Sequence, residues 1–398
     1  MPITLDPYSL LMGMTVVNLL MIGFILPFMP GERNRLADRL FALFCLTHAA
    51  ANTGDMLAIN QVFQRYPALI EVDTLCLLLV APLLYGYVMA MTRISFTLTR
   101  HHLGHLLPML LYFLWLLPYK LLPTAELSRQ YQAWVSGRQP VPWMAVVYPK
   151  LVVLGYLTAT YLALVRHKRT LPRVVSNLDN RELKWLTALV FALIALSLSW
   201  IGNTRGFVPS LAVALLHLGY SYWLAYHVIT QPAIYTHLAP TFALQTVELP
   251  ELGRYRNSSL STPQIERLKQ TIVTYTQTAK PYLFNELTLP MMAEGLRMPP
   301  AQLSQVLNEG FGENFYAFIN RHRVEESKRL LSDPAKGHYS ILAIAFEAGF
   351  NSKSTFNKTF RQQVGLPPSL YQQQHRSVLP PTTSDSVERD VRLDETDS

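Results

Sequence analysis

The first 230 residues alternate long apolar runs with short polar connectors. A bilayer core about 30 Å thick requires roughly 20 apolar residues per helix, and seven stretches reach or approach this length. They lie near 8–29, 37–60, 68–91, 103–122, 143–165, 183–202 and 207–229. This pattern predicts an all-α protein in which residues 1–230 form a seven-helix membrane domain that anchors the chain.

A different pattern begins after residue 230. Residues 231–262 are rich in Pro, Thr, Ser and Arg, which is typical of a linker. Thr262 followed by Pro263 is typical of a helix N-terminus. Four apolar residues then recur on one helical face: Ile265, Leu268, Ile272 and Tyr275. The sequence therefore predicts a second, helical domain over 263–376, followed by an acidic, disordered tail over 377–398.

Short helices occur in two pairs within this second domain. In the first pair, residues 288–296 lead through a tight break to residues 300–308. After a longer helix over 313–331, residues 340–348 lead through Gly349 to residues 352–362. A short helix, a turn and another short helix form the motif that presents its second helix to the major groove of DNA.

The second pair resembles the AraC/XylS family of transcription regulators. Ten residues stand in the family's order: Ile344, Ala345, Gly349, Phe350, Ser352, Phe356, Phe360, Gly365, Pro368 and Tyr371. The first pair and the linking helix agree at Ala293, Leu296, Leu303, Leu307, Gly312, Phe315, Arg323, Leu330 and Leu331. The resemblance covers about 287–371 and implies a DNA-binding domain with two helix-turn-helix units. The chain departs from the family at Pro299-Pro300, where a capping hydroxyl residue is usual, and at Gln305 and Gln372, where Arg is frequent.

A recognition helix needs an apolar face for packing and a polar face for DNA. In the first recognition helix, Leu303, Val306 and Leu307 are expected to pack inward, as are Phe356 and Phe360 in the second. Eleven residues then remain for base edges or phosphates: Ala301, Gln302, Ser304, Gln305, Asn308, Lys353, Ser354, Thr355, Asn357, Lys358 and Arg361. Double-stranded DNA is the expected partner, and an assumed homodimer would present four recognition helices.

Charge is distributed unevenly between the two parts. Residues 1–240 contain 9 of the 26 acidic groups and 17 of the 34 basic groups, which accounts for the whole net charge of +8. One set of alternating connectors holds eleven Lys and Arg residues and the other holds five. Because Lys and Arg accumulate in cytoplasmic loops, we expect a multi-pass protein of the bacterial inner (cytoplasmic) membrane with its N-terminus outside and its DNA-binding domain in the cytoplasm.

Several ionisable residues lie inside or beside the apolar stretches. Asp55, Asp73 and Lys150 fall roughly 8 to 10 Å below the outer surface when counted along the helices, and Glu71 is shallower. Because charges in a membrane are costly and mark functional sites, one hypothesis places these residues, with Arg205, around a pocket for an unknown small-molecule signal. The alternative is a structural ion pair or side chains that extend to the interface.

No pattern in the sequence indicates catalysis, a cofactor or a metal. Phosphate-binding loops, dinucleotide-binding turns and nucleophile motifs do not occur. Cys45 and Cys76 lie in apolar runs, and the histidines at 101, 102 and 105 lack a carboxylate or thiol at ligand spacing. The expected function is a one-component transcription regulator. The alternatives are a transporter or a membrane scaffold with a regulatory cytoplasmic tail.

Overall fold

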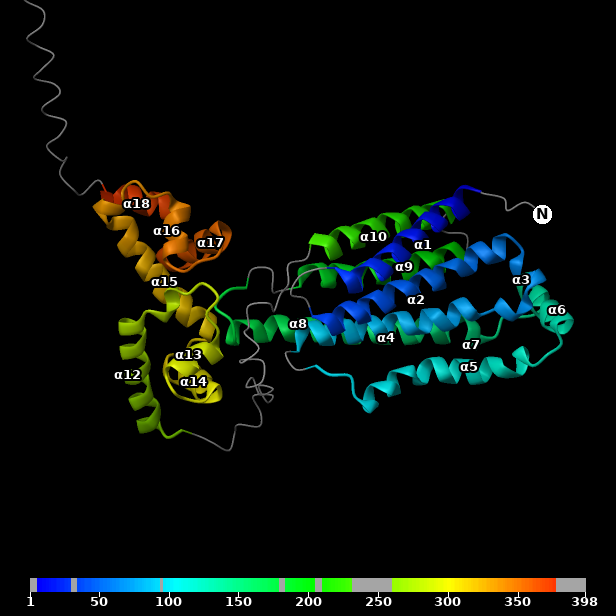
Figure 1. The fold of residues 1–398 in the computed structure, drawn as a ribbon, viewed down its shortest axis with the longest axis horizontal. Helices are drawn as coiled ribbons and strands as arrows, with labels where there is room; N and C mark the ends of the chain where they lie inside the picture. Colours follow the sequence, from blue (N-terminus) through cyan, green and yellow to red (C-terminus); the bar gives the residue numbers. More distant parts are fainter. Residues whose placement is uncertain are drawn as a thin grey trace, which may run out of the picture. The chain divides into compact units, whose positions relative to one another are not determined.

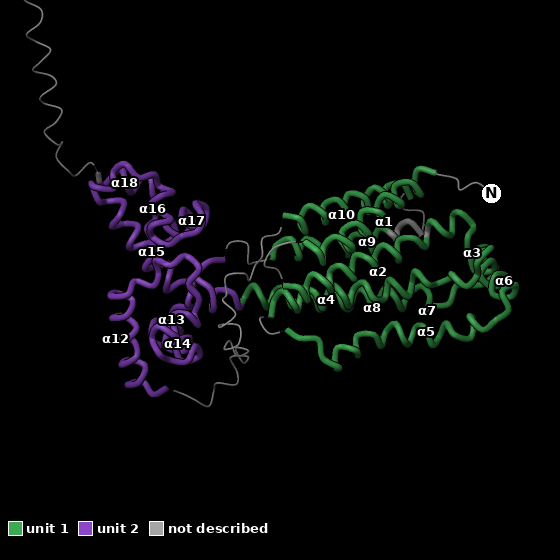
Figure 2. Tube along the Cα trace, in the orientation of Figure 1, with its two compact units in different colours: residues 1–169, 180–248 green, residues 170–179, 249–398 purple. Residues whose placement is uncertain are grey.

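The computed structural model describes residues 6–29, 34–93, 96–178, 183–204, 210–230 and 260–376. The chain divides into two compact units, drawn in different colours in Figure 2. The first unit contains Met1–Arg169 and Asn180–Glu248. The second contains Leu249–Ser398 together with the short segment Thr170–Asp179. The expected linker over 231–262 and the acidic tail lie almost wholly outside the described residues.

Long helices make up most of the first unit (Figure 1). They are α1 (Pro7–Ile25), α2 (Arg35–Ile59), α4 (Val72–Thr92), α5 (Leu107–Lys120), α8 (Tyr148–Thr170), α9 (Lys184–Thr204) and α10 (Ser210–Thr230). Shorter elements connect them: η1 (Leu26–Phe28), α3 (Val62–Arg65), η2 (Pro67–Leu69), η3 (Arg100–Leu106), α6 (Thr124–Val135) and α7 (Trp143–Val146). Each of the seven predicted apolar stretches overlaps one long helix.

Four of the described helical segments are long and apolar enough to cross a membrane. They are Pro7–Phe28, Pro67–Thr92, Arg100–Lys120 and Trp143–Arg173. The helical part of the sequence prediction is confirmed, whereas seven membrane crossings stay a prediction.

The core of the first unit is a cluster of apolar side chains from most of its long helices. Leu19, Phe44, Leu84, Leu189 and Leu224 come from α1, α2, α4, α9 and α10, and each is fully buried. A hydrogen bond from Asn18 Nδ2 to Ser221 Oγ, 3.1 Å long, also joins α1 to α10.

The described part of the second unit is helical as well, so the predicted all-α class is confirmed. Its elements are η4 (Leu171–Arg173), α12 (Thr262–Ala279), η6 (Pro281–Leu283), α13 (Leu289–Gly295), α14 (Pro300–Gln305), the π-helical η7 (Val306–Gly310), α15 (Phe315–Ser332), η8 (Pro334–Lys336), α16 (Ile341–Glu347), α17 (Lys353–Val364) and α18 (Pro368–Arg376).

Two hydrophobic cores share the helix α15. Ile272, Leu303 and Phe318 belong to the core that α12, α13 and α14 form with the first half of α15. Leu330 and Phe356 belong to the core that α16 and α17 form with its second half. The second unit therefore contains two small helical bundles connected by one continuous helix (Figure 1).

Side-chain caps explain where several of these helices begin. Thr288, Ser340 and Ser352 accept hydrogen bonds from backbone N–H groups in the first turns of α13, α16 and α17, the helices expected to start near these residues. The start of α12 differs by one residue. Ser261, not Thr262, is its N-cap and forms a capping box with Gln264.

Candidate nucleic-acid interface

The first helix-turn-helix unit consists of α13 and α14. Arg297, in the turn between them, has a φ of 52°, a left-handed conformation that reverses the chain within a few residues. Leu303, Val306 and Leu307 are fully buried in the core, as predicted. The opposite face of the second helix is therefore the face that can meet DNA.

This first recognition helix is irregular at both ends. It begins after Pro299, which offers no side-chain cap, so the departure from the usual hydroxyl residue has the expected local effect. After its six residues, the backbone changes from α to π geometry over Val306–Gly310. π-bulges inside helices occur frequently at functional sites.

Ser304 does not belong to the solvent face, contrary to the sequence prediction. Its side chain is only 8% exposed. The physical reason is spacing, because Ser304 lies three residues before Leu307 and so shares its inward side of the helix. Asn308 Nδ2 also donates to the Ser304 carbonyl at 2.7 Å.

The exposed face of the first recognition helix is rich in amides and carries one carboxylate, that of Glu309. Asn308 is exposed, and Ala301, Gln302 and Gln305 are partly exposed. Gln305 Nε2 donates to the carboxylate of Glu309 at 3.0 Å, so one of its amide hydrogens is already occupied. Amide side chains can hydrogen-bond base edges in the major groove.

The second unit consists of α16 and α17, joined by a turn at Gly349. This glycine has a φ of 91°, as predicted from the sequence. A Cβ atom at this position would lie 2.3 Å from the carbonyl oxygen of Tyr282. Both the backbone conformation and the close approach of another chain segment therefore require glycine here.

The second recognition helix, α17, is strongly amphipathic. Phe356 and Phe360 are fully buried, as predicted. Six residues lie on the partly or fully exposed side: Lys353, Ser354, Thr355, Asn357, Lys358 and Arg361. Across the described residues, no ion pair involves Lys353, Lys358 or Arg361. Three cations are thus available for phosphates on this helix, whereas the first recognition helix has none.

A buried arginine connects the two helix-turn-helix units. Arg323, on α15, is 1% exposed. Its guanidinium donates to the carbonyl oxygens of Tyr282 at 2.8 Å and Phe284 at 2.9 Å. It also donates to the carbonyl and hydroxyl oxygens of Ser176, both at 3.1 Å. The sequence matched Arg323 to the family but gave no sign of the contact with Ser176.

The predicted sensing residues lie in the first unit, and only some of them are described. The side chains of Asp55 and Arg205 are outside the described residues. The Tyr112 hydroxyl donates to the Glu71 carboxylate at 2.6 Å. Asp73 packs so closely on Gly54 that a Cβ atom there would lie 2.1 Å from its carboxylate oxygen. Lys150, on α8, is partly exposed.

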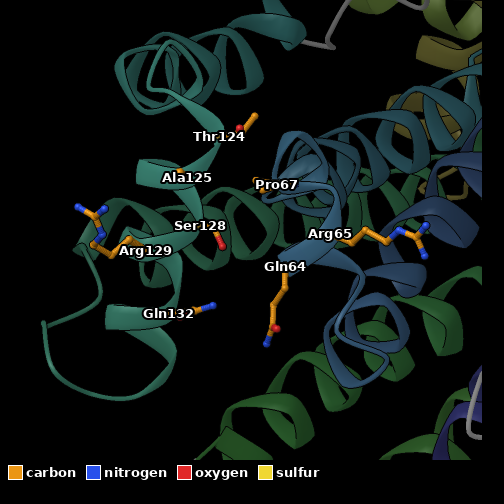
Figure 3. Close-up of a pocket in the computed structure, with 8 residues that line it drawn as sticks. All are labelled: Gln64, Arg65, Pro67, Thr124, Ala125, Ser128, Arg129 and Gln132. Carbon is orange, nitrogen blue, oxygen red and sulfur yellow. The ribbon is translucent and has the colours of Figure 1, made fainter. Parts of the chain in front are cut away.

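A hollow of about 490 Å³ opens elsewhere in the first unit, between the α3–η2 region and α6 (Figure 3). Its lining is largely polar and consists of Gln64, Arg65, Pro67, Thr124, Ala125, Ser128, Arg129 and Gln132. None of the predicted sensing residues lines it. Their joint role in a pocket therefore stays a prediction.

The histidines near the start of α5 have structural partners. His102 forms a capping box with Thr99, and His105 hydrogen-bonds the Tyr156 hydroxyl at 2.9 Å. Within the described ranges, no group of three or more His, Cys, Asp or Glu side chains could hold a metal ion.

Each bundle contains a helix pair joined by a turn with a positive-φ residue, and the second helix of each pair has an exposed outer face. These features define a DNA-binding domain with two helix-turn-helix units. Comparison with known proteins agrees with this class. Residues 292–374 match the family described as a helix-turn-helix domain, so the AraC/XylS-type domain predicted from the sequence is confirmed.

Three curated relatives match a part of the chain. Regulatory protein PocR of Salmonella typhimurium is 29% identical over 113 residues, covering 28% of this chain and 35% of the relative. The uncharacterized HTH-type transcriptional regulator YobQ of Bacillus subtilis is 33% identical over 91 residues, covering 23% and 36%. The HTH-type transcriptional regulator Rv1931c of Mycobacterium tuberculosis is 29% identical over 80 residues, covering 20% and 30%.

The chain therefore spans about a third of the length of these curated relatives. No solved structure gives a significant match.

Proposed function

We propose that this chain is a membrane-bound, one-component transcription regulator. Its second unit binds specific double-stranded DNA through α14 and α17, and a signal received by the membrane domain modulates that binding. The observation that carries the proposal is that two recognition helices with exposed outer faces pack against the two halves of one continuous helix, α15. With 18 residues, α15 is about 27 Å long, comparable with the roughly 34 Å repeat of the major groove.

The two recognition helices have different roles in this proposal. The cations of α17 neutralise phosphates and supply most of the salt-dependent affinity. The amides of Gln302 on α14 and Asn308 on η7 contact base edges and contribute selectivity. Ser304 has no direct role, because it is buried.

Exposed apolar stripes support a membrane location for the first unit. On α1 and η1, Leu10, Met14, Val17, Met21, Phe24 and Phe28 recur at helical spacing, and each is at least 44% exposed. On α5, Leu107, Leu110, Leu111 and Leu114 form a second stripe. Contiguous apolar faces of this kind are unfavourable in water and are the surface that lipid chains cover.

The basic connectors support an orientation with the N-terminus outside the cell and the DNA-binding domain in the cytoplasm. Single cysteines test this arrangement in a variant without the two native ones. Ser128→Cys on α6 should react with a membrane-impermeant maleimide in intact spheroplasts, whereas Ser354→Cys on α17 should react only after the membrane is opened. The reverse labelling pattern would exclude the proposal.

The signal is proposed to act near the outer ends of α4 and α8, at Glu71, Asp73 and Lys150, with Asp55 and Arg205 as further candidates. The Glu71–Tyr112 hydrogen bond supports a polar site there, and Lys120, whose Nζ donates to the Ala68 carbonyl at 2.8 Å, adds a cation. Asp73→Asn should insert normally and lose the response of a reporter gene. Glu126→Gln, at an exposed ion pair with Arg129, is the matched control.

DNA binding is the experiment that decides between this function and a transporter or scaffold. Chromatin immunoprecipitation of the wild-type chain identifies its target fragment, and nanodisc-embedded protein is then titrated with that fragment and with unrelated DNA. Selective binding that weakens with salt supports a regulator.

Lys358→Ala should lower the slope of log affinity against log salt by about 0.9, the value for one phosphate contact. Lys269→Ala, on α12, should leave it unchanged. Equal affinity for all duplexes at every salt concentration would rule out the proposed function.

A further inference from the structure

The chain contributes to its DNA-binding domain from two separate places in the sequence. Thr170–Asp179 lies between α8 and α9, yet it belongs to the second unit (Figure 2). Four of its side chains are largely buried there: Leu171, Val175, Ser176 and Asn177 are 8%, 6%, 1% and 7% exposed. A connector between two long helices is usually exposed, so this burial requires a specific explanation.

Backbone pairing holds the segment against the first helix-turn-helix unit. Val175 and Thr288 form an isolated antiparallel bridge. The Ser176 N–H donates to the Leu287 carbonyl at 3.2 Å, and the Leu289 N–H donates to the Val174 carbonyl at 2.8 Å. Leu289 is the first residue of α13, so the segment satisfies a backbone donor that the helix itself leaves unpaired.

Side chains on α15 hold the same segment from a second direction. The Ser176 carbonyl accepts from Arg323 Nη1 at 3.1 Å and from Asn320 Nδ2 at 3.3 Å. The Ser176 hydroxyl accepts from Arg323 Nη2 at 3.1 Å and donates to the Leu287 carbonyl at 2.7 Å. Ser176 therefore provides two hydrogen-bond acceptors to the buried guanidinium. Because a buried charge is costly unless it is hydrogen-bonded, the loss of these acceptors would destabilise the domain.

The second helix-turn-helix unit meets the same guanidinium. A Cβ atom on Gly349 would lie 3.1 Å from Arg323 Nε. The guanidinium carbon also lies 5.9 Å from the centre of the Phe350 ring. One side chain thus contacts the buried connector, the backbone before α13 and the turn between α16 and α17.

We propose that residues 171–178 form a docking segment, an intramolecular ligand of the DNA-binding domain that holds its two helix-turn-helix units in the arrangement that binds DNA. The segment acts as a support and not as a blocker, because α14 and α17 keep their exposed faces while it is in place. Since the docking segment is covalently continuous with α8, a movement of α8 or α9 changes its position. This inference rests on the proposed function and gives the signal a route to the domain.

A disulfide tests whether the segment docks in the full-length protein. Val175 and Thr288 form the type of antiparallel pair whose Cα atoms are about 4.5 Å apart, within the range of about 4.4 to 6.8 Å that disulfides span. The double variant Val175→Cys/Thr288→Cys, oxidised in native membranes, should yield a peptide linked between these positions, detected by mass spectrometry. The two single variants control for linkage to the native Cys45 and Cys76. Absence of the 175–288 linkage overturns the proposal.

A segment variant tests whether docking matters for binding. Val174→Gly/Val175→Gly/Ser176→Gly removes the buried side chain of Val175, the partly buried side chain of Val174 and the hydroxyl acceptor of Ser176. In nanodiscs, it should bind the immunoprecipitated target fragment about tenfold more weakly than wild type, a loss expected when a buried charge loses part of its hydrogen bonding. The control is Arg138→Gly/Pro140→Gly/Val141→Gly, in an exposed loop of the first unit.

The two experiments separate failure of this inference from failure of the proposed function. Wild-type affinity in the segment variant overturns the supporting role of the docking segment and leaves a DNA-binding regulator intact. If the wild-type chain selects no DNA, the proposed function fails, whereas the disulfide still reports whether the segment docks. Membrane insertion of each variant, measured by quantitative immunoblot, confirms that equal amounts of protein are compared.

Discussion

Arg323 donates two hydrogen bonds to Ser176, a residue that precedes it by 147 positions in the chain. The remaining acceptors around its guanidinium are backbone carbonyls and the Asn320 side chain. Burial lowers the pKa of Arg323 to about 10, so the side chain stays protonated at neutral pH. Neutral oxygen acceptors from three parts of the chain therefore stabilise this buried cation. Because they lie on different sides of the guanidinium, its planar shape is essential for reaching all of them.

Replacing this arginine with lysine should therefore be costly although the charge is kept. An ammonium group is compact and cannot reach acceptors on several sides at once. For Arg323→Lys we expect a loss of about 3 kcal/mol in the free energy of unfolding of the second unit, measured from hydrogen exchange of the α15 amides in nanodiscs. Arg329→Lys is the matched control, because Arg329 pairs with Glu326 while its side chain is 57% exposed. That variant should change stability by less than about 1 kcal/mol. Equal losses in the two variants would contradict this account of Arg323.

Two glycines with similar backbone conformations should respond differently to alanine. Gly349 and Gly365 have φ angles of 91° and 82°. A Cβ atom on Gly365 meets nothing within 4 Å, whereas one on Gly349 meets the Tyr282 carbonyl. Gly365→Ala should cost only the left-handed backbone strain, about 1 to 2 kcal/mol. Gly349→Ala adds a steric clash and should destabilise the second unit more. Urea midpoints measured by hydrogen exchange compare the two, and a smaller effect at Gly349 would refute the close approach.

The elements that could be predicted from the sequence are those specified by local signals. Thr288, Ser340 and Ser352 mark helix starts because a hydroxyl beside the first turn satisfies its free N–H groups. Phe356 and Phe360 lie inside because they are four residues apart on the apolar face of a helix. Gly349 was predictable from the positive φ that a tight turn requires.

Features that depend on distant parts of the chain were not predictable in this way. Ser304 was misplaced because a polar residue was assumed to face solvent, although its spacing from Leu307 places it inward. Nothing local distinguishes Ser176 from a serine in any exposed connector. Leu171 and the adjacent pair Val174-Val175 are apolar residues in a largely polar and basic connector, and they are a signal that could have indicated burial there.

Glu309 should weaken DNA binding by the first recognition helix. Its carboxylate is exposed, lies next to Asn308 in the sequence and holds the amide of Gln305 at 3.0 Å. Removing the negative charge reduces repulsion from phosphates and releases Gln305 for DNA. We expect Glu309→Gln to bind the target fragment about threefold more tightly at low salt, with the difference shrinking as salt screens the charge. Glu266→Gln, in an exposed ion pair on α12, is the control. Unchanged or weaker binding by Glu309→Gln would place Glu309 away from the DNA.

His322 should make the second unit sensitive to acid. The ring stacks on Tyr282 at 5.6 Å and meets the Phe318 ring edge-on at 4.8 Å. Burial, reinforced by the nearby Arg321, lowers the pKa of His322 from 6.5 to about 4, against the opposing effects of Glu313 and Glu325. The folded unit therefore holds this imidazole neutral across a pH range in which the unfolded chain binds a proton.

The sign of the pH effect follows from this difference. Well above pH 6.5 neither state binds the proton, so His322 contributes no pH dependence there. As the pH falls from 6.5 towards 4, the unfolded state binds the proton first. Proton binding lowers the free energy of the unfolded state but not that of the folded state, so the free energy of unfolding decreases. Urea midpoints of the second unit at pH 7.5, 6.5 and 5.5, measured by hydrogen exchange, should fall for wild type and fall less for His322→Gln. Carboxylates stay ionised in both states across most of this range, so a parallel decline in both proteins would assign the pH dependence to another group.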